Sequence, residues 1–339
     1  MKRESGRLKT WLKLAAFLSC LLLLAACGTD SPDKVVKKVE KAWGDHEGYT
    51  LQANMEMQSG GQTKEYGIEV WHTKPEFYRV EVVEKESDTR QIIVKNKDGV
   101  YIVAPSINKT YEFQSEWPAK NSQAYFIHTL MNDLKSDENL KMTETEKEFE
   151  FEVATQNNEK TGLPTQKIKI DKKSFAPVQV TLFDDAGEEK IKIAFDKVNF
   201  KEIHPSKEYT IDISTEQKED AKEQGTKDSE TTYYPTHEFA NTKLVDEKVI
   251  MDGDRLRTIL TYEGEKRYTL MQEPAVASNS MIPVFASGEI AQVGGVFGTA
   301  TENSLTWEDK GKSFFLASSD LSIHEMVEVA SSMTENSLK

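Results

Sequence analysis

Residues 51–70 read LQANMEMQSGGQTKEYGIEV, and this stretch decides the fold. Apolar and polar side chains alternate from Leu51 to Met57 and again from Tyr66 to Val70. Successive side chains of a β-strand point to opposite faces, so each segment is predicted to be a strand with one buried face and one wet face. The pair Gly60-Gly61 between them is typical of a tight turn. The stretch therefore predicts an antiparallel hairpin.

The same alternation recurs along the chain after this hairpin. Further strands are predicted at residues 77–83, 91–95, 100–103, 110–113, 149–153, 168–170, 178–182 and 191–195. Two helices are predicted at about 32–43 and 122–134, where apolar residues recur three and four positions apart. Consecutive strands with one buried face predict a large antiparallel sheet that curls, with the helices on its concave side.

An acidic stretch separates this part from the rest of the chain. Residues 214–231 hold nine charged side chains and only Ala221 as an apolar one, which predicts a solvated, flexible linker. Residues 232–339 are then predicted to form a small C-terminal α+β domain. A capping box of Ser322 and Glu325 predicts the start of its last helix.

Turn and strand signals also define the inside of this C-terminal domain. A hairpin is predicted around Asp252-Gly253, and further strands are predicted near 293–299, 304–308 and 313–318. The glycines Gly294, Gly295 and Gly298 lie in the first of these strands, where they indicate a tight bend or bulge.

The N-terminus has the features of an export signal. Basic residues within 2–13 precede an apolar run of 13 residues, 14–26, which is shorter than the roughly 20 residues of a membrane-spanning helix. The run leads into Leu24-Ala25-Ala26-Cys27, which resembles the bacterial lipobox. The resemblance implies that a signal peptidase recognises Leu24, Ala25 and Ala26, removes the signal peptide 1–26 and leaves Cys27 acylated in membrane lipid. The alternative is a plain signal peptide that happens to end near a cysteine.

Composition weighs against several classes of function. Removal of residues 1–26 takes away five basic residues and one acidic residue, which changes the formal charge from −14 to −18. So acidic a chain repels nucleic-acid phosphates, and no nucleic-acid partner is expected. The only cysteines, Cys20 and Cys27, precede the folded part, which is therefore predicted to have no disulfide and no cysteine-ligated metal.

Catalytic motifs are also missing from the sequence. The six histidines are scattered without an HExxH pair, and neither a GxSxG elbow nor a Walker loop occurs. We therefore expect a protein that is not an enzyme and that has no cofactor, catalytic residue or metal site. A hydrolase that acts on cell wall or lipid is a further hypothesis, but the sequence offers little support for it.

Two short elements carry a resemblance to a known family. The strand Pro75-Glu76-Phe77-Tyr78-Arg79-Val80 is similar to that family's Pro-x-x-hydrophobic-Arg element, and Pro177-Val178-Gln179-Val180 follows an Asp-x-x-Ser turn at Asp171–Ser174. With the opening helix, they make the first part resemble the LolA/LolB-like lipoprotein-sorting superfamily. The resemblance implies an α+β, mainly antiparallel β fold: an unclosed β-barrel lidded by helices. This lipid-anchored half-barrel would span residues 27–213.

The whole chain resembles the YdcC-type sporulation-associated lipoproteins of Bacillus-like bacteria. The marks of the C-terminal part are Trp307, Phe314, Leu316 and the helix start Leu321–Glu325. The resemblance implies a protein on the extracytoplasmic face of a Gram-positive cell membrane, with a role in sporulation. The superfamily's carriers are soluble shuttles, whereas this chain is predicted to be tethered.

Two hypotheses about function follow from these features. The first is a binding protein whose half-barrel holds an acyl chain or a lipidated ligand such as a lipoprotein. Its candidate cavity residues are Met55, Met57, Tyr78, Val80, Phe149 and Phe151. The alternative for these residues is that they fill their own core. The second hypothesis is an envelope sensor that binds a membrane protein partner.

Overall fold

The hairpin of residues 51–70 is present in the computed structural model, which describes residues 31–87, 89–114, 116–118, 123–156, 162–211, 231–253, 255–278 and 280–335. It joins β1 (Gly48–Ser59) to β2 (Gln62–Thr73) in antiparallel register. Leu51, Ala53 and Met55 are only 1–3% exposed, so the predicted buried face is confirmed. Both turn glycines have positive φ, 58° and 76°, a conformation that glycine adopts without strain.

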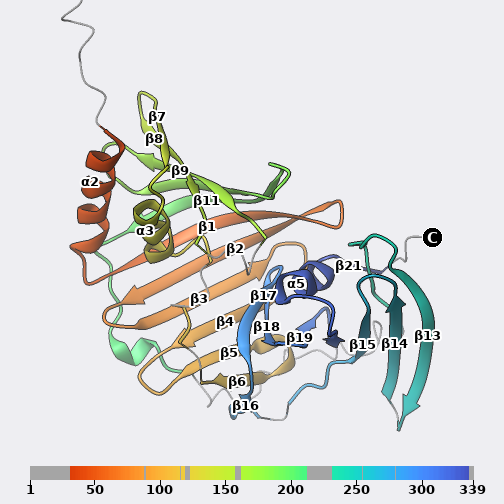
Figure 1. Cartoon of the computed structure of the whole chain (residues 1–339). Coiled ribbons are helices and arrows are strands. Elements are labelled where there is room, and N and C mark those ends of the chain that lie inside the picture. Colours follow the sequence, from red (N-terminus) through yellow and green to blue (C-terminus); the bar gives the residue numbers. More distant parts are fainter. Residues whose placement is uncertain are drawn as a thin grey trace, which may run out of the picture.

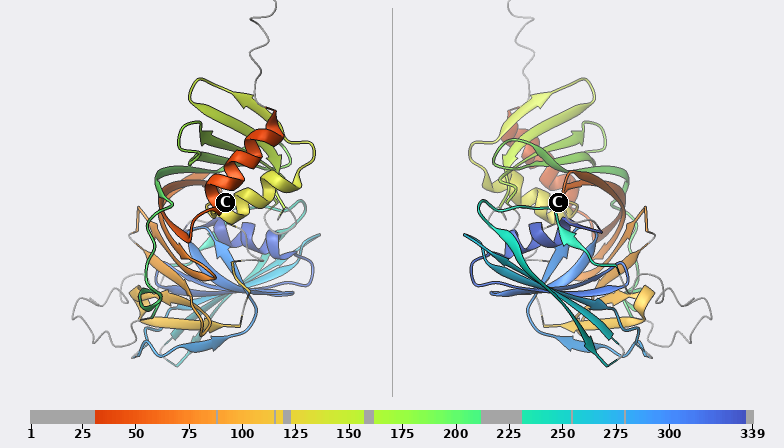
Figure 2. Two further views of the ribbon diagram at one scale, coloured as in Figure 1. Left: turned by 90° about the vertical axis from the view of Figure 1, so that its left-hand side faces the viewer. Right: turned by 90° about the vertical axis from the view of Figure 1, so that its right-hand side faces the viewer.

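The hairpin lies in the middle of a twelve-stranded sheet with the order β16-β6-β5-β4-β3-β2-β1-β11-β10-β9-β8-β7. The two outermost strands do not pair with each other, so the sheet is open, as predicted. Figures 1 and 2 show it curling around helices. Its other strands are β3 (Phe77–Glu84), β4 (Arg90–Lys95), β5 (Val100–Ala104), β6 (Lys109–Phe113), β7 (Lys141–Glu144), β8 (Glu148–Ala154), β9 (Thr165–Asp171), β10 (Pro177–Phe183), β11 (Glu189–Asn199) and β16 (Val284–Ala286).

One strand of this sheet comes from the C-terminal part of the chain. β16 pairs in parallel with β6, with Val284 opposite Tyr111 and Ala286 opposite Phe113. The sheet is therefore mixed rather than purely antiparallel, because β16 arrives by a long crossover from the far end of the chain. The proposed linker 214–231 lies outside the described residues except for Thr231, so the domain boundaries stay a prediction.

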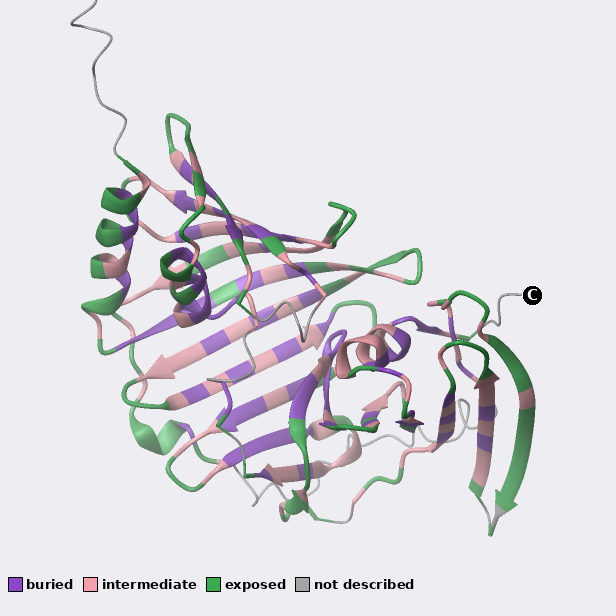
Figure 3. Cartoon of the chain, viewed as in Figure 1, coloured by how far each residue is buried: buried purple, intermediate pink, exposed green. Residues whose placement is uncertain are grey.

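Two helices pack on the concave face of the first sheet. α2 (Pro32–Gly44) has its predicted bounds to within one residue, and its apolar stripe, including Val35 and Val39, is buried against the sheet. α3 (Ile127–Ser136) begins later than predicted. The reason is that Phe126 has an extended backbone, φ −82° and ψ 131°, and is fully buried in the core. Figure 3 shows the buried segments that these helices cover.

The C-terminal part forms a seven-stranded antiparallel sheet with the order β13-β14-β15-β20-β19-β18-β17. Its strands are β13 (Lys243–Asp252), β14 (Arg255–Glu263), β15 (Tyr268–Pro274), β17 (Glu289–Val293), β18 (Val296–Thr301), β19 (Ser304–Asp309) and β20 (Lys312–Ala317). A small second sheet pairs β12 (Tyr234–Pro235) with β21 (Met333–Thr334). The single strand predicted at 293–299 is wrong, because Gly294, with φ 60°, makes a hairpin turn there.

The last helix follows the sequence signal closely. α5 (Ile323–Ser331) is capped by Ser322, whose hydroxyl accepts from the Glu325 amide, while the Glu325 carboxylate accepts from the Ser322 amide. The predicted capping box is therefore confirmed. The helix buries Met326, Val329 and Ala330 against the seven-stranded sheet.

Side chains from both parts of the chain meet at a common junction. Ile290 and Phe297, from β17 and β18, belong to the hydrophobic core of the first sheet. The Phe297 amide donates to Gln91 Oε1 at 2.6 Å. Glu308 on β19 binds Lys109 Nζ at 2.5 Å and accepts from the Tyr111 hydroxyl at 2.8 Å. The C-terminal sheet is thus docked onto the concave side of the first one.

Candidate ligand-binding pocket

A half-open pocket of about 480 Å³ lies between the first sheet and the C-terminal part. One wall comes from β1, β10 and β11 of the first sheet, and the opposite wall comes from β17 and α5. The segment before α3 and the residues that precede β9 close the side. The pocket therefore exists only because the two parts are docked.

The wall on the first sheet is apolar. Met55 and Met57, two of the six predicted cavity residues, line it. They lie beside other aliphatic side chains of the same wall, namely Leu163, Leu182, Ile191 and Ile193. Burial of an alkyl chain against such a wall is favourable by about 0.8 kcal/mol per methylene.

The other four predicted cavity residues lie elsewhere. Tyr78, Val80, Phe149 and Phe151 are at most 8% exposed, belong to the core of the first sheet and do not line the pocket. Tyr78 stacks on His72 at a centroid distance of 4.2 Å. These four side chains therefore fill the part of the concavity beneath α2 and α3.

Two histidines are enclosed in this filled region. Tyr78 contacts both His72 and His128, and His128 also stacks on Phe126 at 5.2 Å. Burial, with a smaller contribution from His72, lowers the pKa of His128 to about 4. Burial likewise lowers the pKa of His72, although the Phe77 carbonyl opposes this. Both imidazoles are therefore held neutral in the fold at neutral pH.

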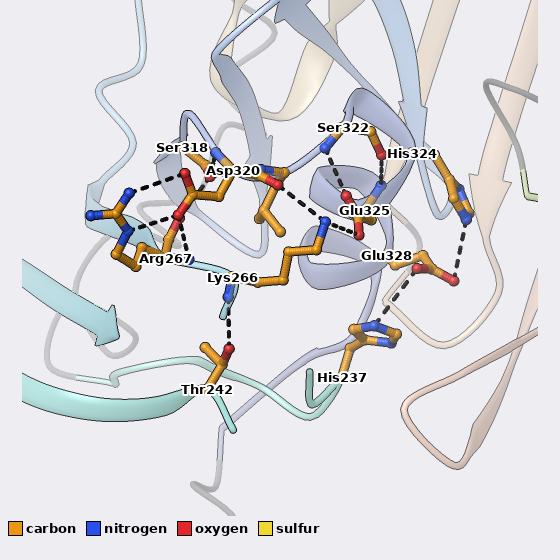
Figure 4. Close-up of polar contacts among 11 residues, drawn as sticks. His237, Thr242, Lys266, Arg267, Ser318, Asp320, Ser322, His324, Glu325 and Glu328 are labelled. Atoms are coloured by element: carbon orange, nitrogen blue, oxygen red, sulfur yellow. Dashed lines mark hydrogen bonds and ion pairs between the residues drawn. The ribbon is translucent and has the colours of Figure 1, made fainter. Parts of the chain in front are cut away.

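The wall formed by the C-terminal part carries polar groups. Glu328 on α5 lies between two imidazoles: its carboxylate oxygens are 3.5 Å from His324 Nε2 and 3.6 Å from His237 Nε2 (Figure 4). His324 lies one turn before Glu328 on the same helix. His237 follows β12, and its amide donates to Ser332 Oγ at 3.0 Å. All three line the pocket.

The start of α5 is fixed by further ion pairs, also visible in Figure 4. Lys266 Nζ is 2.8 Å from Glu325 Oε1, and Arg267 Nε is 2.8 Å from Asp320 Oδ2. The hydrogen bonds from Arg267 lower the pKa of Asp320 to about 2. None of these four residues borders the pocket. Their contacts therefore hold the polar wall in place without forming part of it.

A second charged group lies at the pocket on the side of the first sheet. Lys190 Nζ is 2.9 Å from both Asp184 Oδ2 and Glu188 Oε2. Hydrogen bonds to Glu188 and Asp184 raise the pKa of Lys190. Burial acts to raise the pKa of Asp184, but hydrogen bonds from Lys190 and the Glu188 amide outweigh it and the pKa is lowered. Lys190 is therefore a charged ammonium group whose positive charge is balanced by the carboxylates of Asp184 and Glu188.

The first sheet also touches α5 directly at the pocket. Gly162 has φ 62°, and a Cβ atom built on it would lie 2.0 Å from His324 Nε2. The His324 ring therefore lies flush against the Gly162 backbone. This contact closes one side of the pocket.

Two carboxylates, one buried and one half-buried, lie near the pocket at the junction of the two sheets. Glu84 is 7% exposed, and Asp309 Oδ1 is shielded from solvent with no hydrogen-bond partner in the described part of the chain. Both residues line a hollow of about 10 Å³ together with Lys64 and Tyr66. Burial, and then the charge of Glu84, raises the pKa of Asp309.

The pocket combines one aliphatic wall with one wall that carries His237, His324 and Glu328. Among the described residues, no three His, Cys, Asp or Glu side chains are arranged to hold a metal ion. Sequence reasoning missed His237, His324 and Glu328. The spacing of His324 and Glu328 on a predicted helix is the one signal that places two of them on the same face.

The predicted lipidation segment lies outside the described residues. Cys27 and the recognition residues Leu24, Ala25 and Ala26 all precede residue 31. Among the residues that the structure describes, no helix is long and apolar enough to cross a membrane.

A curled, open sheet with helices on its concave face and a pocket beneath the seven-stranded C-terminal sheet defines a mainly β protein of the α+β class. The family model described as "Sporulation protein YdcC-like" matches residues 8–209. The chain is 33% identical over 340 residues to "Sporulation protein YdcC" of Bacillus subtilis (strain 168), with 98% of each chain covered. The chain belongs to this YdcC-like family.

Two solved structures are also similar to it. The MucA/MucB complex of Pseudomonas aeruginosa matches with a TM-score of 0.33 and 13% identity, over 90% of this chain and 99% of that one. The LolA superfamily protein NE2245 of Nitrosomonas europaea matches with a TM-score of 0.31 and 10% identity, over 54% of this chain and 99% of that one.

Proposed function

We propose that this protein is a membrane-anchored extracytoplasmic lipoprotein that binds an acyl chain or a lipidated ligand. The observation that carries this proposal is the half-open pocket of about 480 Å³ with one aliphatic wall. Small-molecule sites are typically concave, mostly apolar and roughly 300–1,000 Å³ in volume. Met55 and Met57 suit a site for flexible chains, because methionine adapts its shape to the ligand.

The same proposal includes the lipid anchor at Cys27 and the location of the protein at a cell membrane. Cys27 holds the protein in the lipid after removal of residues 1–26, and α2 begins at Pro32, so only a few residues separate the anchor from the fold. Two or three acyl chains hold a protein firmly to a bilayer. The relative in Bacillus subtilis is named a sporulation protein, which supports a role in sporulation at a Gram-positive cell membrane.

The test is a homologous series of neutral alkyl maltosides, from octyl to tetradecyl, added below their micelle concentrations. The protein is the chain from Gly28 onward, which keeps every described residue, and binding is measured by calorimetry. We expect saturable binding to one site, with Kd falling about fourfold per added methylene until the pocket is full. Absence of saturable binding, or an affinity that ignores chain length, would refute the proposal.

A second candidate function is favoured by the exposed edge of the C-terminal sheet. β13 is ten residues long and pairs on one side only, with β14. Its apolar side chains are exposed, among them Val249 at 56% and Met251 at 63%. A long, apolar edge strand is a template for strand addition by a partner. Such a partner would make the protein an interaction module that regulates a membrane protein.

Photo-crosslinking in intact cells tests this second candidate. A crosslinking residue at Val249 is expected to trap one discrete membrane protein, because the edge would be covered by the partner. The same residue at exposed Lys201 serves as the control. Identical crosslinks from both positions, or none from Val249, would count against a partner at this edge.

A further inference from the structure

The charged side chains around the pocket do not balance. Three carboxylates line it, those of Asp184, Glu289 and Glu328, against the single ammonium of Lys190. Lys190 is already within 2.9 Å of two carboxylates, one of them from Glu188 outside the lining. Apart from its two imidazoles, the lining therefore holds three carboxylates and one ammonium group.

Glu328 is the carboxylate best placed to meet a ligand. Its nearest cationic partners would be His324 and His237, but the contacts of 3.5 Å and 3.6 Å are longer than charge-assisted hydrogen bonds, which are near 2.8 Å. Its side chain is 39% exposed and borders the pocket. Its oxygens therefore keep the capacity to accept hydrogen bonds from a bound molecule.

The two walls differ in chemistry in a way that selects a kind of ligand. The first sheet offers the aliphatic side chains of Met55, Met57 and Ile193, whereas α5 offers a carboxylate. An alkyl chain fits the first wall, and a group with N–H donors and positive charge fits the second. An anionic headgroup would meet repulsion at the same place.

On the basis of the proposed function, we propose that the ligand is an amphiphile with a cationic headgroup, whose alkyl chain lies along β1 and β11 and whose ammonium group binds Glu328. Alkylamines and acylated molecules that keep a free amine have this chemistry. Fatty acids and phosphate monoesters of lipids do not.

Three ligands with the same dodecyl chain test this proposal: dodecylammonium, dodecyl maltoside and dodecyl sulfate. Each is titrated below its micelle concentration, at equal ionic strength, into the chain from Gly28 onward. We expect the ammonium compound to bind about threefold to tenfold more tightly than the maltoside, and the sulfate to bind most weakly. Added salt should shrink these differences and leave maltoside binding unchanged.

A pair of matched variants assigns the effect to Glu328. Glu328→Gln should remove most of the preference for ammonium while keeping the affinity for maltoside, because the amide has the same shape but no charge. Glu302→Gln is the control, since Glu302 is exposed and does not line the pocket. Should Glu328→Gln fail to fold, Glu328→Met, which is of similar length and also uncharged, takes its place and should give the same loss of preference.

The outcomes separate this inference from the proposed function. Binding of the maltoside without any preference for ammonium over sulfate would overturn the inference alone. Preference for ammonium that survives in Glu328→Gln would overturn the role of Glu328. Failure of all three dodecyl compounds to bind would overturn the proposed function, and this inference with it.

Discussion

Gly295 lies directly against the ring of Tyr66: a Cβ atom built on the glycine would be 1.9 Å from the ring carbon Cε1. Tyr66 belongs to β2 of the first sheet, and Gly295 belongs to the turn between β17 and β18. Tyr66 is 1% exposed, so its ring is buried at this contact. This contact sets how closely the two parts of the protein approach each other.

Replacement of Gly295 by alanine is expected to lower the free energy of unfolding by about 1–3 kcal/mol, because the extra methyl overpacks the junction. Urea denaturation, followed by tryptophan fluorescence, measures the free energy of unfolding of the variant and of the parent protein. Gly67→Ala is the matched control, because Gly67 lies next to Tyr66 on β2 and has no atom within 4 Å of a built Cβ. Equal losses in the two variants would show that the space at Gly295 is not limiting.

His128 is expected to make the fold sensitive to acid. Its pKa in the fold is about 4, below the ordinary value of 6.5. The unfolded chain therefore takes up a proton first as the pH falls, so stability is full above about pH 6.5 and is lost towards pH 4. The loss from this group is up to about 3 kcal/mol. Urea midpoints between pH 7 and pH 4.5 measure it.

The variant His128→Phe keeps a ring against Phe126 and Tyr78 but cannot take up a proton. It is expected to flatten the dependence of stability on pH, leaving the smaller contribution of His72, whose pKa is also lowered. If His128→Phe kept the full dependence on pH, the buried imidazole would not be its source.

Asp309→Asn is expected to stabilise the protein at pH 7 by an amount on the order of 1 kcal/mol. The pKa of Asp309 is raised in the fold, so the folded state loses stability as the pH rises above the unfolded pKa, and the loss grows until the pH passes the folded pKa. Thermal unfolding compares the variant with the parent. In a Glu84→Gln background the gain should shrink, since one source of repulsion is already gone; additive gains would argue against coupling between the two carboxylates.

Met57→Trp is expected to weaken binding of alkyl maltosides, and to weaken tetradecyl more than octyl, because the indole fills part of the aliphatic wall. Calorimetry with the same homologous series gives the answer. Met251→Trp on the exposed edge of β13 is the control and should leave every affinity unchanged. A uniform loss for all chain lengths would indicate a general loss of fold rather than a shortened pocket.

Cys27→Ala is expected to abolish attachment to membrane lipid, since only the cysteine thiol accepts the first acyl group. The variant should appear either as released protein or as an uncleaved precursor in fractionated cells. Ala25→Ser, which keeps a small residue for the peptidase, is the control and should remain attached. A Cys27→Ala protein that is still processed after Ala26 and still withstands high salt would contradict the anchor.

Much of the fold was predictable because apolar and polar residues alternate along each strand, and this alternation shows which face is buried. The alternation from Leu51 to Met57 fixes one strand, and Gly60-Gly61 fixes the turn, since both residues adopt positive φ. The capping box at Ser322 fixed the start of α5 in the same way. These are local signals, and each involves residues close together in the chain.

Features that depend on distant contacts were not predictable. The local sequence predicts only a bend within a strand at Gly294, because nothing local shows that the chain reverses against Tyr66. The sequence predicts a cavity within the first sheet alone, whereas nearly half of the pocket lining comes from the C-terminal part. Phe149 and Phe151 have the same alternation as Met55, yet they face a region that α2 and α3 fill. Periodicity tells which face is buried but not what covers it.

The parallel pairing of β16 with β6 has a consequence for synthesis on the ribosome. Residues 109–113 emerge long before residues 284–286, so the outer edge of the first sheet stays uncovered until some 170 further residues have been made. At roughly 5–20 residues per second this interval lasts on the order of ten seconds or more. During that time the nascent chain carries an unpaired strand edge, and a chaperone or the export machinery has a defined interval in which to protect it.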